Sequence, residues 1–548
     1  MQASFKRPSA SFLLLAYVCT VLVGTLAMVM ARSYQSGFSG ADEPSHFLNG
    51  YFVANYLSHH FGSNPMAAAT DFYIHYPKIS IGHWPPAYYG FLGLVFLVLP
   101  PTMGAAFALN VLVAALPAIG IAAALVLLHG RRAAIAGVLL YALTPLVLEG
   151  NAMFMADQPL AACLVAATAV WIAYVCAPGW GKAIGFALLA ALAVLIKGNG
   201  ALIVFVPVFH IVLSASWRLL RSIRLYAAAA LAAMLVVPWY ILTAKIAAEG
   251  FNYQAGVAYA TQALAANLQT LVHNLTPAGI LLAVFGAVAE YRERKRSARR
   301  WTIVSGILSL VLATLTLQSL IPVDIVDRYM APALPAMVIL AVLAAQRLLA
   351  WLAARGKAQA PAIAAAVLAA VIAVPGVMHL AARAPKADTG LAQVAGALAT
   401  GGKPTLTVID GRSGAEGAFI AQMAVHDAGL QGYVIRASKL LADSNFMGSN
   451  YTLKFQRPQQ VVAELRRLGV QHIVIVRENG ADAYPHSKQM REALAATDSG
   501  FLLKQRLAHQ HRPGVTEVYE AAGTAIPDIA AVREMGMPGK AVSLSKLQ

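Results

Sequence analysis

Long runs of apolar residues most restrict how this chain can fold. The first run covers residues 11–31, and a helix needs only about 20 apolar residues to cross a bilayer. Hydrophobic residues make up 59% of the 548 positions, and charged residues make up 12%. A water-soluble domain cannot bury that much apolar surface. The sequence therefore predicts a polytopic α-helical membrane protein.

The apolar runs predict about eleven transmembrane helices within a membrane domain at 1–384. The expected spans lie at about 11–31, 104–128, 133–148, 158–176, 183–196, 201–215, 225–243, 276–289, 301–319, 329–350 and 360–380. Basic residues gather in alternate short loops, which places those loops and the N-terminus in the cytoplasm. This pattern accounts for the net charge of +17, so we expect no nucleic-acid partner. The cysteines lie in expected spans and imply no disulfide.

The other segments are expected on the outer face of the membrane. Residues 32–86 form a long aromatic loop, 87–99 lie along the interface as an amphipathic segment, and 244–275 form a second outer loop. From 385 onward the apolar runs give way to alternating strand and helix patterns. Residues 385–548 are therefore expected to form an extracytoplasmic α/β domain with a largely parallel sheet and a weakly ordered tail after about 521.

An acidic pair, Asp42-Glu43, directly follows the first span. His46 comes next, at near-helical spacing with further polar and aromatic residues. A solvated loop would explain one such acid. A carboxylate at the membrane surface can also act as a general base on an acceptor hydroxyl, which is the interpretation we favour for Asp42. A divalent metal held by Asp42 and His46 is the alternative.

The stretch from Lys78 to Tyr89 combines aromatic and cationic residues. An aromatic belt at the bilayer interface would explain Trp84, Tyr88 and Tyr89. It does not explain Lys78 and His83. A lipid phosphate lies at this depth, so these two side chains are candidate phosphate ligands.

Three more candidate residues lie at predicted span edges. Asp157 opens the fourth span, where helix capping alone would also explain an acid. Lys197 precedes Gly198 and Gly200, and these glycines allow close backbone approach to an anion. Arg328 on the outer side opposes the positive-inside bias and calls for an anionic partner, for which a phosphate is suitable.

The glycines at 411, 414 and 417 follow the first strand of the α/β domain. Their spacing differs from that of the dinucleotide-binding fingerprint. We interpret the segment as a strand-to-helix turn, with a bound anion as the less favoured alternative.

Taken in order, these motifs resemble the GT-C glycosyltransferase superfamily, in the branch of bacterial protein O-mannosyltransferases and the lipid A aminoarabinose transferase. The resemblance covers about residues 10–350. It is carried by Asp42-Glu43, Pro85-Pro86 with Tyr88-Tyr89, Asp157, Lys197-Gly198, and Arg328-Tyr329 with Pro332 and Pro335. Aminoarabinose transferases carry a lysine just before the paired prolines, whereas this chain has Trp84.

The resemblance implies transfer of a sugar from a polyprenyl-phosphate carrier to an acceptor on the extracytoplasmic face, with inversion, in a bacterial inner membrane. It implies Asp42 as the general base, supported by Glu43 and Asp157. Lys197 and Arg328 would hold the donor phosphate with His83 or Lys78. His46, Trp84, Tyr88 and Tyr329 would contact substrate.

Two other functions are compatible with the sequence. A transporter or flippase of lipid-linked glycans would place polar groups near the bilayer midplane, whereas here ionisable residues gather at the outer edge. A non-catalytic assembly protein would tolerate replacement of Asp42 and Asp157. No cofactor is expected beyond the alternative divalent metal, and the acceptor can be a lipid, a glycan or a protein.

Overall fold

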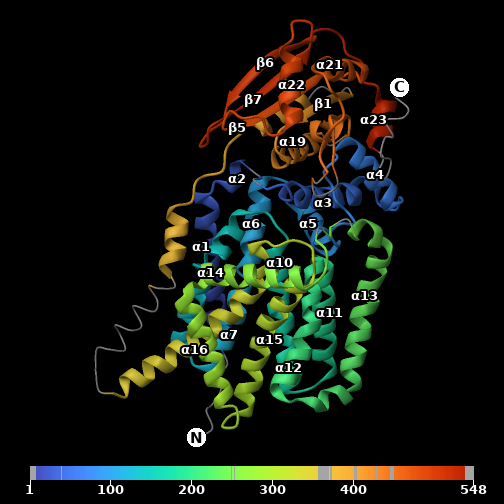
Figure 1. The fold of residues 1–548 in the computed structure, drawn as a ribbon. Coiled ribbons are helices and arrows are strands. Elements are labelled where there is room, and N and C mark those ends of the chain that lie inside the picture. Colours follow the sequence, from blue (N-terminus) through green and yellow to red (C-terminus); the bar gives the residue numbers. More distant parts are fainter. Residues whose placement is uncertain are drawn as a thin grey trace. The chain divides into compact units, whose positions relative to one another are not determined.

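A computed structural model gives the fold (Figure 1). It describes residues 8–536 except 37, 39, 249, 252, 356–369, 371–372, 400–403, 428, 445–447 and 449. The chain forms two compact units. The first comprises Met1–Ala31, Gly82–Tyr88 and Phe107–Ala384, and the second comprises Arg32–Ile81, Tyr89–Ala106 and Pro385–Gln548. Residues 32–81 thus group with the C-terminal segment, whereas the sequence predicted a loop of the membrane domain there.

The first unit is helical. Its elements are α1 (Ala10–Met30), α6 (Met103–Ala114, from Phe107 on), α7 (Pro117–Leu128), α8 (Arg131–Ala142), α9 (Pro145–Ala152), α10 (Asp157–Cys176), α11 (Trp180–Ile196), η2 (Gly198–Val204), α12 (Phe205–Ser214), η3 (Trp217–Arg221), α13 (Ile223–Ala248), α14 (Val257–Arg292), α15 (Ala298–Leu320), η4 (Asp327–Ala333) and α16 (Leu334–Ala353). Among the described residues, 7 helices are long and apolar enough to cross a membrane, or 8 if the bent pair α8–α9 is one span.

This count differs from the eleven spans that the sequence predicted. The expected third span is the pair α8–α9, bent by 56°. The expected fifth and sixth spans are the shorter apolar helices Trp180–Ile196 and Gly198–Ser214. The expected eleventh span, 360–380, falls mostly outside the described residues.

The prediction of an outer loop at 244–275 was wrong for most of these residues. Helix α14 begins at Val257 and runs to Arg292, with non-helical backbone only at Thr276. The polar residues before the kink lie on a helix, and some of them contact neighbouring elements of the first unit. A polar sequence therefore formed a helix because one face is buried, which polarity alone does not reveal.

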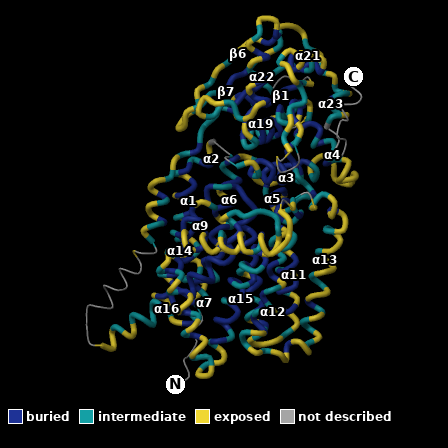
Figure 2. The backbone as a smooth tube through the Cα atoms, in the orientation of Figure 1, coloured by how far each residue is buried: buried dark blue, intermediate teal, exposed yellow. Residues whose placement is uncertain are grey.

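Exposure along α13 agrees with a lipid environment. Only 6% of its most apolar stretch is buried, and Figure 2 shows exposed and half-buried residues along its length. Met234 and Ile241 are each 71% exposed, and Leu242 is 81% exposed. An apolar surface this continuous would be unfavourable in water. By contrast, α16 is buried over residues 334–344 and forms part of the core of the unit.

The second unit combines short helices with a sheet. Its helical elements are α2 (Ser33–Ser36), α3 (Glu43–Asn55), the π-helical turn η1 (Tyr56–His60), α4 (Pro65–His75), α5 (Ala87–Val98, from Tyr89 on), α18 (Leu391–Ala399), α19 (Ser413–His426), α20 (Ala437–Leu440), α21 (Pro458–Arg467), α22 (Pro485–Ala495) and α23 (Ile529–Gly536). Its strands are β1 (Thr405–Asp410), β2 (Gly432–Arg436), β3 (Ala442–Asp443), β4 (Thr452–Leu453), β5 (His472–Glu478), β6 (Phe501–Ala508) and β7 (Gly514–Ala521). The expected loop at 32–86 is therefore largely helical.

The main sheet has the strand order β2-β1-β5-β7-β6. Strand β1 pairs in parallel with β2 and β5, in registers that place Thr405 opposite Gly432 and Thr407 opposite His472. Strand β7 pairs antiparallel with β5 and β6, so the sheet is mixed rather than largely parallel. Strands β6 and β7 form a hairpin, because the short connection between them permits only antiparallel pairing. The tail after 521 includes helix α23.

Candidate active site

A buried carboxylate at the start of α10 meets two cations from other elements. Asp157 is the first residue of α10 and is 5% exposed. Lys197, which follows α11, places Nζ 2.7 Å from Asp157 Oδ1. Arg328, in η4, places Nε 3.5 Å from Asp157 Oδ2. The fold of the first unit thus brings together three residues that the sequence singled out at separate span edges.

Tyr329 adds an aromatic face to this group. Its ring centroid lies 4.7 Å from Lys197 Nζ and 5.7 Å from Arg328 Cζ. The negative face of an aromatic ring attracts cations, and the attraction is stronger where water is displaced. We call Asp157, Lys197, Arg328 and Tyr329 the Asp157 cluster.

The backbone around Lys197 explains why glycine follows it. Lys197 has an extended conformation (φ −158°, ψ 143°), which ends α11 and turns the chain into η2. A Cβ atom on Gly200 would lie 2.2 Å from the carbonyl oxygen of Ala193. A Cβ atom on Gly198 would make only an ordinary contact, 3.5 Å from the hydroxyl of Tyr240. The turn that presents Lys197 therefore requires glycine at position 200.

Two hydrogen bonds that no sequence motif indicated hold the elements of the cluster in place. Thr270 of α14 donates to Asp327 Oδ1 over 2.6 Å, next to Arg328. Asn199 of η2 donates to Gln318 Oε1 of α15 over 3.1 Å. These residues carry no local motif, and only the packing of distant helices reveals their role.

The segment at 82–88 belongs to the same unit. His83 and Trp84 are half-buried, and Tyr88 is buried with its ring centroid 6.3 Å from that of Phe154. The predicted roles of His83, Trp84 and Tyr88 in binding donor and substrate stay predictions.

Asp42 and Glu43 lie in the second unit, where the two acids differ in environment. Asp42 is half-buried, directly precedes α3 and makes no side-chain cap hydrogen bond to that helix. Glu43 is fully buried. Its Oε1 accepts from the backbone N–H of Gly40 over 2.8 Å, and its Oε2 lies 3.2 Å from Lys386 Nζ. These contacts favour a structural role for Glu43 and leave Asp42 as the better candidate for chemistry.

The alternative of a metal held by Asp42 and His46 depends on the surroundings of His46. Its Nδ1 shares a 2.7 Å hydrogen bond with the Tyr89 hydroxyl, and the two rings stack with centroids 5.9 Å apart. Within the described part of the chain, no three His, Cys, Asp or Glu side chains are grouped to hold a metal ion. A divalent metal at Asp42 and His46 stays a prediction, and no step is assigned to it.

Lys78 is also part of the second unit. Its side chain is buried, and its Nζ lies 3.4 Å from Ser413 Oγ at the start of α19. Its predicted partner His83 belongs to the first unit. A shared phosphate site of Lys78 and His83 stays a prediction.

Comparison with known proteins identifies the fold. The family model of dolichyl-phosphate-mannose-protein mannosyltransferases matches residues 83–242, a stretch that includes Asp157 and Lys197. The crystal structure of ArnT from Cupriavidus metallidurans bound to undecaprenyl phosphate aligns with a TM-score of 0.58 and 16% identity, covering 95% of this chain and 100% of that one. The chain has the GT-C fold.

Two other solved structures support this assignment of a GT-C fold. The Archaeoglobus fulgidus oligosaccharyltransferase, in complex with Zn and sulfate, aligns with a TM-score of 0.52 and 13% identity over 84% of this chain and 67% of that one. The mycobacterial arabinofuranosyltransferase AftD aligns with a TM-score of 0.52 and 15% identity over 96% of this chain and 42% of that one. No curated protein sequence matches the chain.

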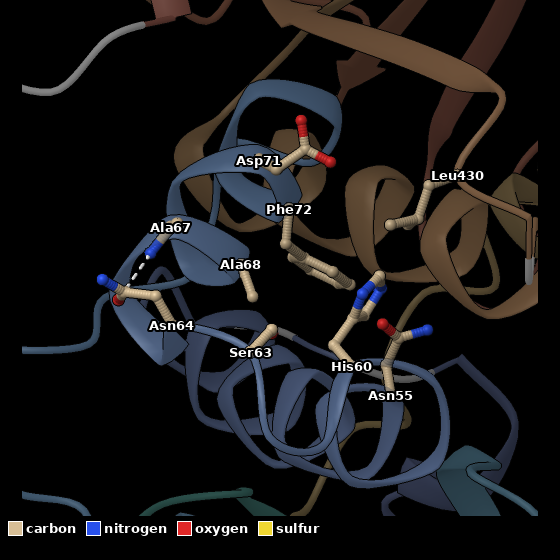
Figure 3. A pocket seen from close by; sticks show the side chains of 9 residues that line it. All are labelled: Asn55, His60, Ser63, Asn64, Ala67, Ala68, Asp71, Phe72 and Leu430. Atoms are coloured by element: carbon tan, nitrogen blue, oxygen red, sulfur yellow. Dashed lines mark hydrogen bonds between the residues drawn. The ribbon is translucent and has the colours of Figure 1, made fainter.

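The second unit of this GT-C chain also contains a pocket of about 240 Å³ that the sequence did not indicate (Figure 3). It lies between η1 and α4 and has both polar and apolar walls. Its lining residues are Asn55, His60, Ser63, Asn64, Ala67, Ala68, Asp71, Phe72 and Leu430. Asp71 also pairs with Arg533 of α23 over 2.6 Å, so the tail of the chain supports one wall.

Proposed function

We propose that the protein transfers a sugar from a polyprenyl-phosphate donor to an acceptor hydroxyl at the extracytoplasmic membrane face, with inversion. The GT-C fold supports this proposal, as does the undecaprenyl phosphate bound in the ArnT structure. The observation that carries it is the convergence of Lys197 and Arg328 on one carboxylate, 2.7 and 3.5 Å away.

The chemistry of the leaving group accounts for these cations. Negative charge grows on the carrier phosphate as its bond to the anomeric carbon breaks. Fixed cations at that position lower the barrier, and removing one such stabilising group typically costs about 10²–10³ in rate. Lys197 and Arg328 would therefore bind the donor phosphate, with the ring of Tyr329 behind them.

Asp157 then acts as a positioning residue for both cations. A buried carboxylate between an ammonium and a guanidinium fixes their directions before the substrate arrives. Such fixed orientation stabilises developing charge without reorganisation during the reaction. The catalytic role that the sequence suggested for Asp157 thus becomes an indirect one in this proposal.

Asp42 is the proposed general base. It would remove the proton from the acceptor hydroxyl as the oxygen attacks the anomeric carbon from the side opposite the leaving phosphate, which gives inversion. Glu43 would hold the start of α3 through Gly40 and Lys386. The proposed substrate contacts of His46, His83, Trp84 and Tyr88 await the same test.

A transfer assay in membranes tests the proposal. Membranes would receive radiolabelled polyprenyl-phosphate sugars, and label in lipid, glycan and protein acceptors would be compared for wild type, Asp42→Asn and Lys197→Met. Lys182→Met is the matched control, because Lys182 is not part of the Asp157 cluster and donates to the backbone carbonyl of Ala177.

We expect transfer by wild type and by the control, and loss by both site variants. Transfer by Asp42→Asn at the wild-type rate would remove Asp42 as the base. Transfer by Lys197→Met at the wild-type rate would remove the Asp157 cluster from donor binding. Absence of transfer by wild type from every donor tested would favour a transporter or an assembly protein.

A further inference from the structure

Three cationic side chains gather at the start of α19 in the second unit. Lys78 Nζ and Arg436 Nη2 each lie 3.4 Å from Ser413 Oγ, although they come from a loop and from the end of β2. Lys439 is close enough to depress the pKa of Lys78. Ser413 is the first residue of α19, a helix of 14 residues with no side-chain cap hydrogen bond at its N-terminus.

The buried carboxylate of Glu416 fixes Arg436. Its Oε2 accepts from Arg436 Nε over 2.8 Å and from Ser438 Oγ over 2.7 Å, while its Oε1 accepts from the backbone N–H of Ser438 over 3.0 Å. The guanidinium is thereby held in one plane, with Nη2 directed to Ser413. The carboxylate of Glu416 thus already accepts hydrogen bonds from Arg436 and Ser438.

Lys78 carries a buried ammonium group. It is 9% exposed, and among the described residues no ion pair within 4 Å includes it. Burial, assisted by the nearby Arg436 and Lys439 and opposed by Glu416 and Asp42, lowers the pKa of Lys78 to about 7. Buried charges are normally paired, so this ammonium calls for an anion.

A glycine in α19, Gly417, provides the space that the Lys78 side chain occupies. A Cβ atom on Gly417 would lie 2.7 Å from Lys78 Cε, so the glycine allows the lysine to lie along α19. This contact gives a reason for the third glycine after β1. The spacing of the glycines predicted the turn, and the turn is formed by Gly411 and the residues up to Ser413.

The position in the sheet is one where ligands bind in open α/β folds. Ser413 follows the carboxyl end of β1, and Arg436 is the last residue of β2. Strand β1 has parallel neighbours on both sides, and the chain passes from β1 to β2 on one side and from β2 back across to β5 on the other. The crevice beyond the carboxyl ends of such strands is the usual ligand position.

We propose that Lys78, Arg436 and Ser413, with the N-terminus of α19, bind a tetrahedral anion of the phosphate class. Ser413 and Gly414 are half-buried and Lys439 is exposed, which leaves a side from which the anion can approach. The anion is either a phosphate group on a lipid or glycan, or free phosphate. Because the site consists only of residues of the second unit, the inference does not depend on the proposed transfer reaction.

Affinity labelling of the full-length protein in detergent tests the site. Pyridoxal 5′-phosphate carries a phosphate and an aldehyde, so its phosphate would occupy the site while Lys78 attacks the aldehyde. The amine and the aldehyde form an imine and release water, and added borohydride reduces the imine to a stable secondary amine. Peptide mapping by mass spectrometry then gives the extent of labelling at each lysine.

We expect Lys78 to be labelled at least fivefold more by pyridoxal 5′-phosphate than by pyridoxal at equal concentration, and inorganic phosphate to protect it. The exposed Lys488 is the internal control and should be labelled equally by both reagents. Ser413→Ala should reduce the labelling of Lys78. Equal labelling of Lys78 by the two reagents, or labelling that phosphate does not reduce, would overturn the proposal.

A second measurement does not rely on labelling. Sulfate, which stays fully ionised across the neutral range, should raise the Tm of the wild type more than chloride does at equal ionic strength. Sulfate also stabilises folded proteins generally, because it is excluded from their surface. Lys78→Met should therefore show a smaller increment than the wild type, and Lys488→Met should show the wild-type increment. Equal increments in wild type and Lys78→Met would contradict the site.

Competition by a phosphate-bearing glycolipid and by inorganic phosphate distinguishes the two possible sources of the anion. Protection of Lys78 by micelles of a phosphate-bearing glycolipid, at concentrations at least tenfold below those needed with inorganic phosphate, would indicate a lipid-linked group. Protection of Lys78 by the glycolipid and by inorganic phosphate at equal concentrations of phosphate groups would indicate free phosphate. Failure of both to protect would rule out the site.

Discussion

Lys197 donates a hydrogen bond to Asp157 across 2.7 Å, and this contact links the end of one helix of the first unit to the start of another. Both side chains are under a tenth exposed. A pair buried this deeply is expensive to break, because removing one member leaves the other charge in a medium of low polarity. The pair thus combines a structural role with its proposed part in donor binding.

The first prediction separates these two roles. Asp157→Asn should lower the free energy of unfolding by about 3–5 kcal/mol, because it removes the carboxylate that both Lys197 and Arg328 face. Lys197→Met should cost less, because Asp157 keeps Arg328 at 3.5 Å. The double variant should be more stable than the sum of the single changes implies, by roughly 0.5–3 kcal/mol. Transfer activity should stay low in the double variant, although its stability partly recovers. Thermal unfolding and transfer assays on the same preparations measure both, and recovered activity would contradict donor binding by Lys197.

The second prediction concerns the ring of Tyr329. Tyr329→Phe keeps an aromatic face near Lys197 and Arg328 and should keep KM for the donor within about twofold. Tyr329→Leu removes that face and should weaken donor binding by about 0.5–2 kcal/mol, the usual range for a cation–π contact. Steady-state kinetics with varied donor concentration would show the difference in KM. Equal KM values for the two variants would mean that the ring only fills space.

The third prediction compares two glycines in one turn. Gly200→Ala should destabilise the protein and reduce transfer, because the added Cβ would lie 2.2 Å from the Ala193 carbonyl oxygen and displace the turn that presents Lys197. Gly198→Ala should be tolerated, because its Cβ would lie 3.5 Å from the nearest atom. Tm and initial rates of the two variants decide the matter. A Gly200→Ala protein with wild-type Tm would show that the turn can shift without loss.

The sequence predicted the features that depend on local pattern. The alternation of strands and helices after residue 385 was confirmed, for example in β1 and β5, because strand alternation and helical periodicity are visible in a few consecutive residues. Asp157 was also found at the first position of its helix, as the break in hydrophobicity before it indicated.

Features that depend on distant partners could not be predicted in this way. The direction of β7 depends on which neighbour it pairs with, and the sequence of the strand carries no sign of that choice. Lys78 is more than 300 positions away from Ser413, so its burial against α19 follows only from the folded chain. The first half of α14, before Thr276, was missed because its polar residues resemble those of a loop.

The fourth prediction is a pH dependence caused by Lys78. Its pKa of about 7 in the folded protein lies below the ordinary lysine value of 10.5, so the folded state binds fewer protons than the unfolded state between these two values. Stability therefore rises with pH in this window, by at most about 1.4 kcal/mol per pH unit, and the unfavourable charge is fully present below it. Lys78→Met should remove this slope. Unfolding curves from pH 6 to 9 measure it, and identical slopes for the two proteins would contradict the burial of the ammonium.

The fifth prediction distinguishes the adjacent acids. Asp42→Asn should abolish most transfer with little change in Tm, because the carboxylate is half-buried and makes no cap hydrogen bond to α3. Glu43→Gln should instead lower Tm, since the buried ammonium of Lys386 loses its charge partner across 3.2 Å. Adding Lys386→Met to Glu43→Gln should restore part of the lost Tm, because the buried ammonium that lost this carboxylate is then removed as well. Measured together, a large loss of turnover in Asp42→Asn and a rescued Tm in the Glu43 double variant would assign chemistry to the first acid and structure to the second. The opposite pattern, with stability lost at Asp42 and turnover lost at Glu43 without a change in Tm, would exchange these roles and make Glu43 the base.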